Sequence, residues 1–306
     1  MPHSATSSET PSPLHIAVYK GNVQSVRSIL QKGGAEVGAV IVYNQTPLHT
    51  AIRLGAVPSA RKEIIRLLLI HEADIRKQDV FGNNALHYAA SEHSDVLAFL
   101  LNDLPPATEK NTAVREQNKA GCTPLALAVQ SGNLGAVQSL LPLSDLKAKD
   151  SRGATALHHA AELTPHDDAT KRGISVEIAL MLLTDTDLDV DDGTENNDTA
   201  LHYAADKGSV ALVNLLVEKS GKSLHAENSE GHTPLQLATL SNARAMLSNE
   251  QLRFAGFPGH TANRHAVIAA LSAALSEPRA MQNADMDMVS EDDGSKRERR
   301  EVGARV

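Results

Sequence analysis

The chain has 306 residues, of which 22% are charged and 3% aromatic, and its formal net charge is −8 at pH 7. This balance argues against direct binding of nucleic acid, which needs clustered Lys and Arg side chains against the phosphates. The sequence contains no run of 18 apolar residues and a single cysteine, Cys122. We therefore expect no membrane span and no disulfide framework, and the cytoplasm is the expected location.

A polar N-terminus, residues 1–10, is expected to be disordered, and a short pattern then recurs along the chain at a spacing of roughly 33 residues. Each copy reads Thr-Pro-Leu-His or a close variant and leads into an alanine-rich stretch. The copies begin at Ser12, Thr46, Asn84, Thr123, Thr155, Thr199 and Thr233. Ala126 and Gln236 replace the histidine in the fourth and seventh copies.

These residue types predict a pair of helices in each copy. A threonine followed by proline is typical of a helix N-terminus, and the leucine and alanine that follow share one helical face. A Gly-Asn or Gly-Ser step such as Gly21-Asn22 then ends the first helix, and a second apolar stripe such as Val26 and Leu30 follows. Neither helix can bury its apolar face alone, so the copies must stack.

The position two residues before each threonine, from the second copy onward, holds only glycine or asparagine. These residues tolerate a left-handed backbone, which a tight turn requires. We expect each to lie at the tip of a β-hairpin finger between repeats. The residues are Asn44, Gly82, Gly121, Gly153, Asn197 and Gly231.

The tetrapeptide, its spacing and the glycine pattern resemble the ankyrin repeat family. The resemblance implies an all-α repeat solenoid of helix-turn-helix units with β-hairpin fingers over residues 11–276. It also implies a binding surface on the concave face and the fingertips, and a structural, hydrogen-bonding role for the repeated histidine.

Three connections are longer than a repeat needs: about Asp103 to Glu116, about Leu163 to Gly173, and about Asn242 to His260. The last precedes a predicted closing helix over 261–276, with Phe254 and Phe257 as a lid over the final repeat. Residues 277–306 are polar and charged and are expected to be a disordered tail. Its basic cluster from Lys296 to Arg300, interrupted by Glu298, is a candidate nuclear address.

No pattern for catalysis, a cofactor or a metal ion is evident, and the chain is expected not to be an enzyme. Phosphate-binding glycine loops, a nucleophile elbow and paired zinc cysteines are all missing from the sequence. The aspartates from Asp185 to Asp198 resemble a calcium loop, but Asp192 stands where such a loop needs glycine. His158, His159 and His166 are interpreted as structural or solvated.

Aromatic and basic residues fall where the family binds partners, and we predict a partner protein at the second to fourth repeats. The first helices are expected to present Tyr19, Arg53, Tyr88, His159 and Tyr203 outward, and the fingertips to present Tyr43, Val80, Phe81, Lys119 and Arg152. Tyrosine and arginine are frequent in interface hot spots.

The sequence therefore favours a non-enzymatic binding scaffold that is a monomer by itself. Two alternatives remain open: an inhibitor of a transcription factor, similar to the ankyrin inhibitors of Rel-type factors, and a bacterial protein delivered into a host cell.

Overall fold

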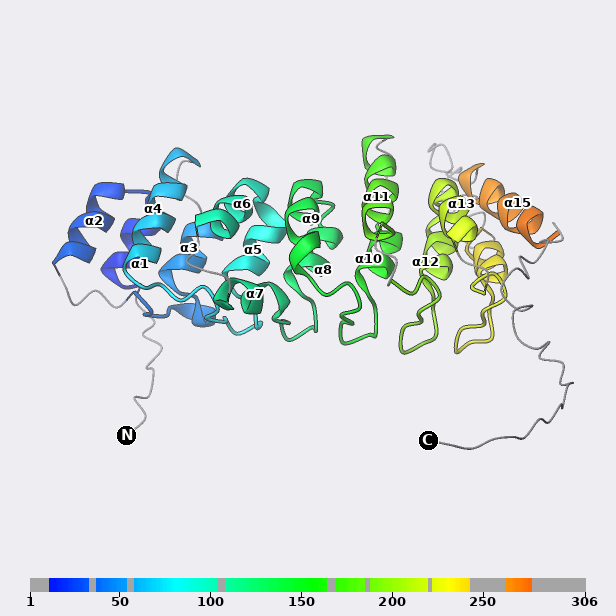
Figure 1. The fold of residues 1–306 in the computed structure, drawn as a ribbon, viewed down its shortest axis with the longest axis horizontal. Coiled ribbons are helices and arrows are strands. Elements are labelled where there is room, and N and C mark those ends of the chain that lie inside the picture. Colours follow the sequence, from blue (N-terminus) through cyan, green and yellow to red (C-terminus); the bar gives the residue numbers. More distant parts are fainter. Residues whose placement is uncertain are drawn as a thin grey trace, which may run out of the picture.

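The computed structural model of the chain describes residues 11–32, 37–53, 58–103, 108–163, 169–184, 188–219, 222–242 and 262–276, which form an elongated row of helix pairs (Figure 1). The first helices of successive repeats are α1 (Pro13–Tyr19), α3 (Pro47–Arg53), α5 (Ala85–Glu92), α8 (Pro124–Gln130), α10 (Ala156–Glu162) and α12 (Ala200–Lys207). The second helices are α2 (Val23–Gln31), α4 (Pro58–Ile70), α6 (Ser94–Asp103), α9 (Leu134–Leu140), α11 (Ala169–Leu182) and α13 (Val210–Lys219). Residues 234–242 are helical and open the seventh repeat.

The predicted helix starts and stops are confirmed. Ser12 and Thr123 accept hydrogen bonds from the backbone N–H three residues later, and proline follows each of them. Gly21, Gly132 and Gly208 have positive φ angles after the first helix of their repeats. In the third repeat His93 takes this place with an extended φ of −144°.

The core is one continuous stack of apolar side chains that runs through the array. The repeat leucines Leu86, Leu157 and Leu201 are at most 1% exposed, and Ala89 and Ala204 on the same face are fully buried. Because alanine is small, the first helices of neighbouring repeats approach closely: α5 packs on α3 and α8, and α10 on α8 and α12. Each repeat is thus stabilised by its neighbours, as expected for a solenoid.

The repeated histidine links one repeat to the next. In the third repeat, His87 Nδ1 accepts from the backbone N–H of Asn84, and Nε2 donates to the carbonyl of Cys122 at 3.0 Å. His15, His49, His158 and His202 reach the carbonyls of Gln45, Asn83, Asp198 and His232 in the same way. We call these five the junction histidines. Burial lowers the pKa of each of them, and that of His87 to about 4.

The fingers lie in a row along one edge of the array (Figure 1). Each is a tight turn closed by two backbone hydrogen bonds, as in Asp79 N to Asn83 O and Gly82 N to Asp79 O. All six predicted tip residues have positive φ, from 57° at Asn197 to 79° at Gly82. Strands do not form among the described residues; one antiparallel bridge joins Gly193 and Thr199. The predicted fingers are therefore present as turns and not as paired strands.

The long connections differ in structure. The first contains a short helix, α7 (Thr108–Arg115), which buries Ala113 and Val114 and packs against α8 and the 3-10 helix η2 (Leu141–Leu143). The predicted closing helix is α15 (Ala262–Ser276), which packs on α13 through Val267 and Leu271.

Other expectations lie outside the described residues, namely those for residues 1–10 and 277–306, for most of the third connection with Phe254 and Phe257, and for His166. Among the described helices, none combines the length and the apolar character that crossing a membrane would require.

Candidate partner-binding surface

The fingertips of the second and third repeats form an exposed apolar patch. Tyr43 is 58% exposed and Phe81 53%, and their rings stack with centroids 5.9 Å apart and planes inclined by 28°. Val42 and Val80, the residues before them, are 55% and 39% exposed. We call Val42, Tyr43, Val80 and Phe81 the fingertip patch. It has the composition of an interface core, because aromatic residues bury a large area with few rotatable bonds.

Tyr43 also holds an unfavourable backbone conformation. Its φ is 66° within the 3-10 helix η1 (Val42–Asn44), and Asn44 after it has a φ of 60°. A residue with a Cβ in this region costs roughly 1 to 3 kcal/mol, and such residues cluster at functional sites. The other finger turns place only glycine or asparagine in the left-handed region. The strained tip therefore presents a bulky exposed ring where glycine would give a more stable turn.

The fingers are joined to one another by one backbone hydrogen bond at each step. Val80 N donates to Tyr43 O, Lys119 N to Phe81 O, Ser151 N to Ala120 O and Glu195 N to Arg152 O, each at 2.9 Å. A Cβ on Gly82 would lie 2.7 Å from Lys119 N, so glycine is needed both for its φ and for this close approach. The finger row is thus a connected support, and the fingertip patch has a fixed geometry.

Tyr88 does not point outward as predicted. It is 8% exposed; its hydroxyl donates to Asp79, and its ring meets the His49 ring edge-on at 5.8 Å between centroids. Asp79 in turn accepts from the backbone N–H groups of Phe81 and Asn83. Burial raises the pKa of the Tyr88 hydroxyl. Tyr88 is therefore a positioning residue that braces the finger carrying Phe81.

The same bracing corrects the prediction for His159. Its side chain is fully buried, and Nε2 lies 3.3 Å from Asp150, the residue that accepts backbone N–H groups at the base of its own finger. Burial lowers the pKa of His159 even though Asp150 opposes this shift. Tyr203 is only partly buried and stands edge-on to His158 at 5.9 Å. In the third and fifth repeats the residue four positions after the start of the tetrapeptide therefore packs between repeats, because the finger base and the preceding first helix enclose it.

The remaining predicted residues are accessible to differing degrees. Tyr19 is 59% exposed and Lys119 is exposed. The Arg53 side chain is 35% exposed, with its guanidinium carbon 4.8 Å from the centre of the Tyr88 ring. The Arg152 side chain is half exposed but pairs with Asp150 and Glu162, which raise its pKa. The sequence predicted that these residues lie at the surface. It did not predict the contacts of Arg53 with Tyr88, or of Arg152 with Asp150 and Glu162.

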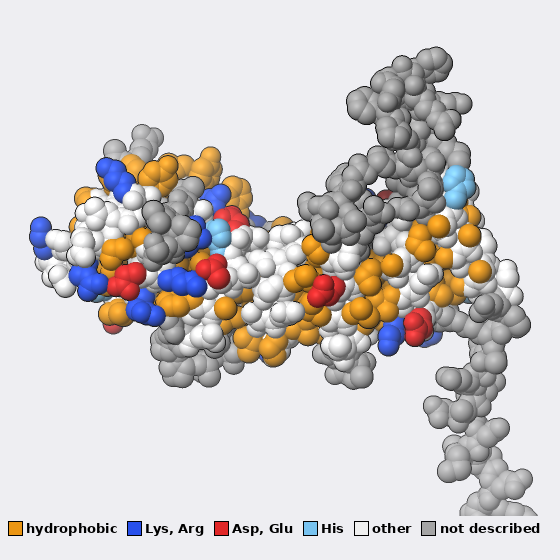
Figure 2. All heavy atoms as spheres, turned by 90° about the horizontal axis from the view of Figure 1, so that it is seen from above, with side chains coloured by type: hydrophobic (Ala, Val, Ile, Leu, Met, Phe, Trp, Pro, Cys, Tyr) orange, Lys and Arg blue, Asp and Glu red, His pale blue; other side chains and the backbone are white. Residues whose placement is uncertain are grey.

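Charge is distributed unevenly along the array. Exposed Arg27, Lys62 and Arg66 lie on α2 and α4, and Figure 2 shows Lys and Arg side chains gathered over the N-terminal repeats on the face opposite the fingertips. Toward the other end, a cavity of about 320 Å³ between the sixth and seventh repeats is lined by Asp198, Tyr203, Asp206, Glu230 and other polar residues. The exposed fingertip residues Glu195 and Glu230 add to this acidic end.

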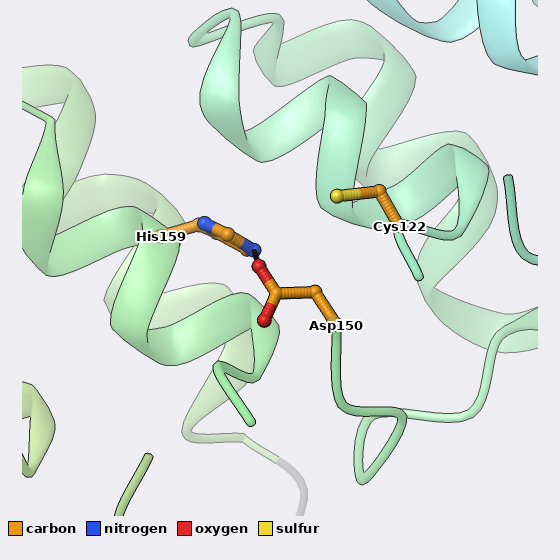
Figure 3. A group of neighbouring side chains, drawn as sticks. All are labelled: Cys122, Asp150 and His159. Atoms are coloured by element: carbon orange, nitrogen blue, oxygen red, sulfur yellow. Dashed lines mark ion pairs between the residues drawn. The ribbon is translucent and has the colours of Figure 1, made fainter. Parts of the chain in front are cut away.

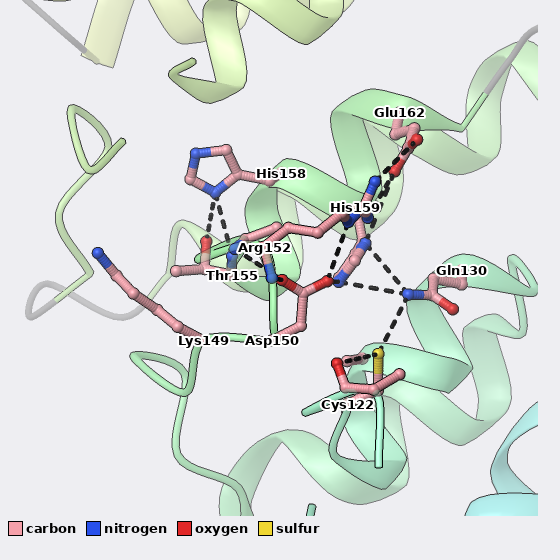
Figure 4. A network of polar contacts seen from close by, with 12 residues as sticks. Cys122, Gln130, Lys149, Asp150, Arg152, Thr155, His158, His159 and Glu162 are labelled. Atoms are coloured by element: carbon pink, nitrogen blue, oxygen red, sulfur yellow. Dashed lines mark hydrogen bonds and ion pairs between the residues drawn. The ribbon is translucent and has the colours of Figure 1, made fainter. Parts of the chain in front are cut away.

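The fourth repeat departs from the pattern at its junction with the fifth. Ala126 has no imidazole to reach the next repeat, and a polar cluster spans this junction instead (Figure 4). The Gln130 amide contacts both Cys122 Sγ at 3.5 Å and the His159 ring nitrogens at 3.2 and 3.3 Å. Sequence reasoning missed this cluster because its members come from two finger bases and two helices.

Comparisons with known proteins agree with this architecture. A family model described as ankyrin repeats matches in three copies, over residues 14–112, 107–172 and 166–249. B-cell lymphoma 3 protein of Homo sapiens is 32% identical over 232 residues, which cover 74% of this chain and 47% of that protein. The nuclear factor NF-kappa-B p105 subunit of Gallus gallus is 31% identical over 189 residues, which cover 61% of this chain and 17% of that protein.

A solved structure extends the comparison to the fold. The ankyrin repeat domain of Bcl-3, described as a unique member of the IkappaB protein family, matches with a TM-score of 0.62 and 26% identity, covering 87% of this chain and all of that domain. The chain spans about half the length of the first of these relatives, and less of the second. Together with the stacked helix pairs and the finger row, these matches establish that the chain belongs to the ankyrin repeat family.

Proposed function

We propose that the chain is a non-enzymatic recognition scaffold whose partner protein docks across the fingertips of the second to fourth repeats. The observation that carries this proposal is the stacked pair of Tyr43 and Phe81, each more than half exposed on neighbouring fingers. Contiguous apolar patches of this kind are uncommon on proteins that do not use them for binding. The backbone strain at Tyr43 supports a selected role for its ring.

The charges around the fingertip patch define the chemistry of the partner. Lys119 borders the patch on the next finger, while Glu195, Glu230 and the acidic cavity lie farther along the same edge. A partner that covers both regions needs an apolar surface at one end and basic groups toward the other. Charge complementarity of this kind orients the partner and speeds association more than it raises affinity.

A Rel-type transcription factor is a more specific candidate for the partner. It is supported by the similarity to a member of the IkappaB family and to an NF-kappa-B subunit. Both sequence relatives named above are eukaryotic proteins, which favours this candidate over a bacterial protein delivered into a host cell. It would place the chain in the cytoplasm or the nucleus.

Site-specific photocrosslinking tests the docking surface. A photoreactive phenylalanine analogue in place of Phe81 should capture a partner from the native lysate, and the analogue in place of Ile70 is the control. Ile70 is 67% exposed at the end of α4 and lies outside the finger row, so it matches the exposure of the patch without its position. Equal capture by the same protein at both positions, or capture at Ile70 alone, would contradict the proposed surface.

Direct binding separates the scaffold proposal from the Rel candidate. The full chain is titrated with a purified Rel homology region, and the double variant Tyr43→Ala with Phe81→Ala is titrated beside it. Binding by the wild type and loss in the variant would support both proposals. Absence of binding with successful capture of another protein at Phe81 would retain the scaffold and reject the Rel partner.

A further inference from the structure

At the junction of the fourth and fifth repeats, the thiol of Cys122, the carboxylate of Asp150 and the imidazole of His159 face one small space (Figure 3). One ligand atom from each of the three residues lies within 4.8 Å of the other two. The cluster is enclosed: Cys122 is 5% exposed, the Asp150 side chain 4% and the His159 side chain 0%. From this arrangement we propose that Cys122, Asp150 and His159 form a zinc-binding site.

The donor set and its spacing suit zinc. Thiolate, imidazole and carboxylate are the three protein ligands that Zn²⁺ uses, in tetrahedral geometry. The usual bond lengths place tetrahedral ligand atoms about 3.3 to 3.6 Å apart. His159 Nε2 and Asp150 Oδ2 already lie at 3.3 Å, so mainly the thiol of Cys122 must move inward.

The surroundings prepare each ligand. Asp150 Oδ1 is held by the backbone N–H groups of Arg152 and Ala154 at 2.8 and 2.9 Å, which leaves Oδ2 directed at His159. Glu162 lies 3.8 Å from His159 Nδ1 on the other side of the ring. A shift of the Glu162 carboxylate by less than about 1 Å would let it accept from Nδ1–H, which would leave Nε2 to bind metal, as in many zinc sites.

Charge balance also permits a divalent cation in this enclosed place. A Cys122 thiolate and the Asp150 carboxylate together neutralise Zn²⁺, and a neutral buried site avoids the cost of an uncompensated charge. Arg152 lies 3.4 Å from the same Asp150 oxygen and would be repelled. Its guanidinium also pairs with Glu162 at 3.2 Å, so it can leave Asp150 and remain in an ion pair.

The fourth position of the tetrahedron belongs to Gln130 or to water. The Gln130 amide contacts both the thiol and the imidazole, and rotation about its terminal bond would direct its oxygen at the metal. The site bridges the fourth and fifth repeats. Bound metal would therefore stabilise the junction at which Ala126 stands in place of a junction histidine.

Cobalt is the probe for the experiment, because a bound thiolate gives Co²⁺ a strong near-ultraviolet absorption band and Cys122 is the single cysteine of the chain. The tag-free, full-length reduced protein is titrated with Co²⁺ and then with Zn²⁺. We expect a charge-transfer band that saturates at one equivalent and is displaced by Zn²⁺. We also expect Zn²⁺ to raise the melting temperature.

Two variants and a control decide between zinc binding and a purely structural polar cluster. Cys122→Ser should abolish the band, and Asp150→Asn should weaken Zn²⁺ binding at least tenfold, while both keep the helical circular dichroism of the wild type. His225→Asn, which removes an exposed histidine in the sixth repeat, should change neither. Absence of the thiolate band in the folded wild type, or Zn²⁺ binding that survives Cys122→Ser unchanged, would overturn the proposal.

Discussion

Some residues of this array stabilise the stack of repeats, and others are exposed on its surface, where a partner could bind them. The repeat leucines and alanines are buried, while Tyr43 and Phe81 at the fingertips are more than half exposed. Tyr88 shows that exposure cannot be assigned from the residue type alone, because its ring fills the space between the finger base and the preceding helix. Stability and binding should therefore respond to different substitutions.

Truncation of a core leucine should be far more costly than truncation of a fingertip ring. Leu157→Ala is expected to lower the free energy of unfolding by about 2 to 5 kcal/mol, since it removes a side chain that is 1% exposed and leaves a cavity. Phe81→Ala should cost less than about 1 kcal/mol, mainly from loss of the stacking on Tyr43. Urea unfolding of both variants measures the difference, and equal costs would show that Phe81 belongs to the core.

The left-handed backbone at Tyr43 reverses the usual ranking of alanine and glycine. Tyr43→Gly should be more stable than Tyr43→Ala by about 1 kcal/mol, because alanine keeps the strain and glycine does not. At Val42, whose φ is not positive, alanine should be the more stable of the two. Thermal melts of the four variants test this, and a Tyr43→Ala protein as stable as Tyr43→Gly would mean that the turn relaxes without its ring.

At the scale of structural elements, the contacts at the junctions between neighbouring repeats stabilise the array. At five junctions an imidazole donates to a carbonyl of the next repeat. In four of them its other ring nitrogen accepts a backbone N–H of its own repeat, and in the first repeat His15 Nδ1 contacts the Ser12 hydroxyl instead. The fourth repeat has Ala126 instead, which leaves the carbonyl of Ala154 without this bond. The Asp150 N–H still donates to that carbonyl at 2.9 Å.

Restoring the histidine should strengthen this junction. Ala126→His is expected to raise the free energy of unfolding by about 0.5 to 1.5 kcal/mol, the usual net value of one hydrogen bond. Calorimetry of the variant measures the gain. Gln138→His, on the exposed face of α9, serves as control. A loss of stability in Ala126→His alone would mean that the neighbouring polar cluster has closed the space that an imidazole needs.

Acid should loosen the junctions before it acts on the rest of the array. Folding lowers the pKa of the junction histidines, that of His87 to about 4, so below pH 6.5 the unfolded chain binds protons that the folded chain excludes. Stability should be fully present above pH 6.5 and fall as the pH drops, by up to about 1.4 kcal/mol per pH unit for each histidine.

Melting temperatures measured from pH 7 to pH 4.5 test this dependence. The variant His87→Gln should show a shallower decline, since Gln236 already accepts the equivalent threonine N–H in the seventh repeat without titrating. A decline of the same slope in the variant would place the acid sensitivity at other groups.

Structural features could be predicted from the sequence where the residues of a single repeat determine them. Helix starts, the glycine ends and the six left-handed tip residues follow from local rules, and the structure confirms them. The inward direction of Tyr88 and His159 could not be inferred, because it depends on a finger base nine residues away and on the preceding repeat. The cluster of Cys122, Asp150 and His159 could not be found for the same reason.

At the scale of the whole molecule, the stacked repeats form one extended surface whose two ends differ in polarity and charge. The fingers lie in register along one edge, with the apolar patch near the N-terminal end and acidic groups toward the other. A partner that binds this edge would contact the fingers of several repeats at once. The partner protein is therefore proposed to bind at the fingertip patch, and substitutions in this patch test the proposal.

The affinity of the partner captured at Phe81, measured by calorimetry against three forms of the chain, tests this location most directly. Tyr43→Ala combined with Phe81→Ala should weaken binding by about 2 kcal/mol or more, roughly thirtyfold, as loss of aromatic anchors does. Ile70→Ala, an exposed apolar residue away from the fingers, should leave the affinity within twofold of the wild type. Wild-type affinity in the double variant would contradict the account and place the binding surface elsewhere on the array.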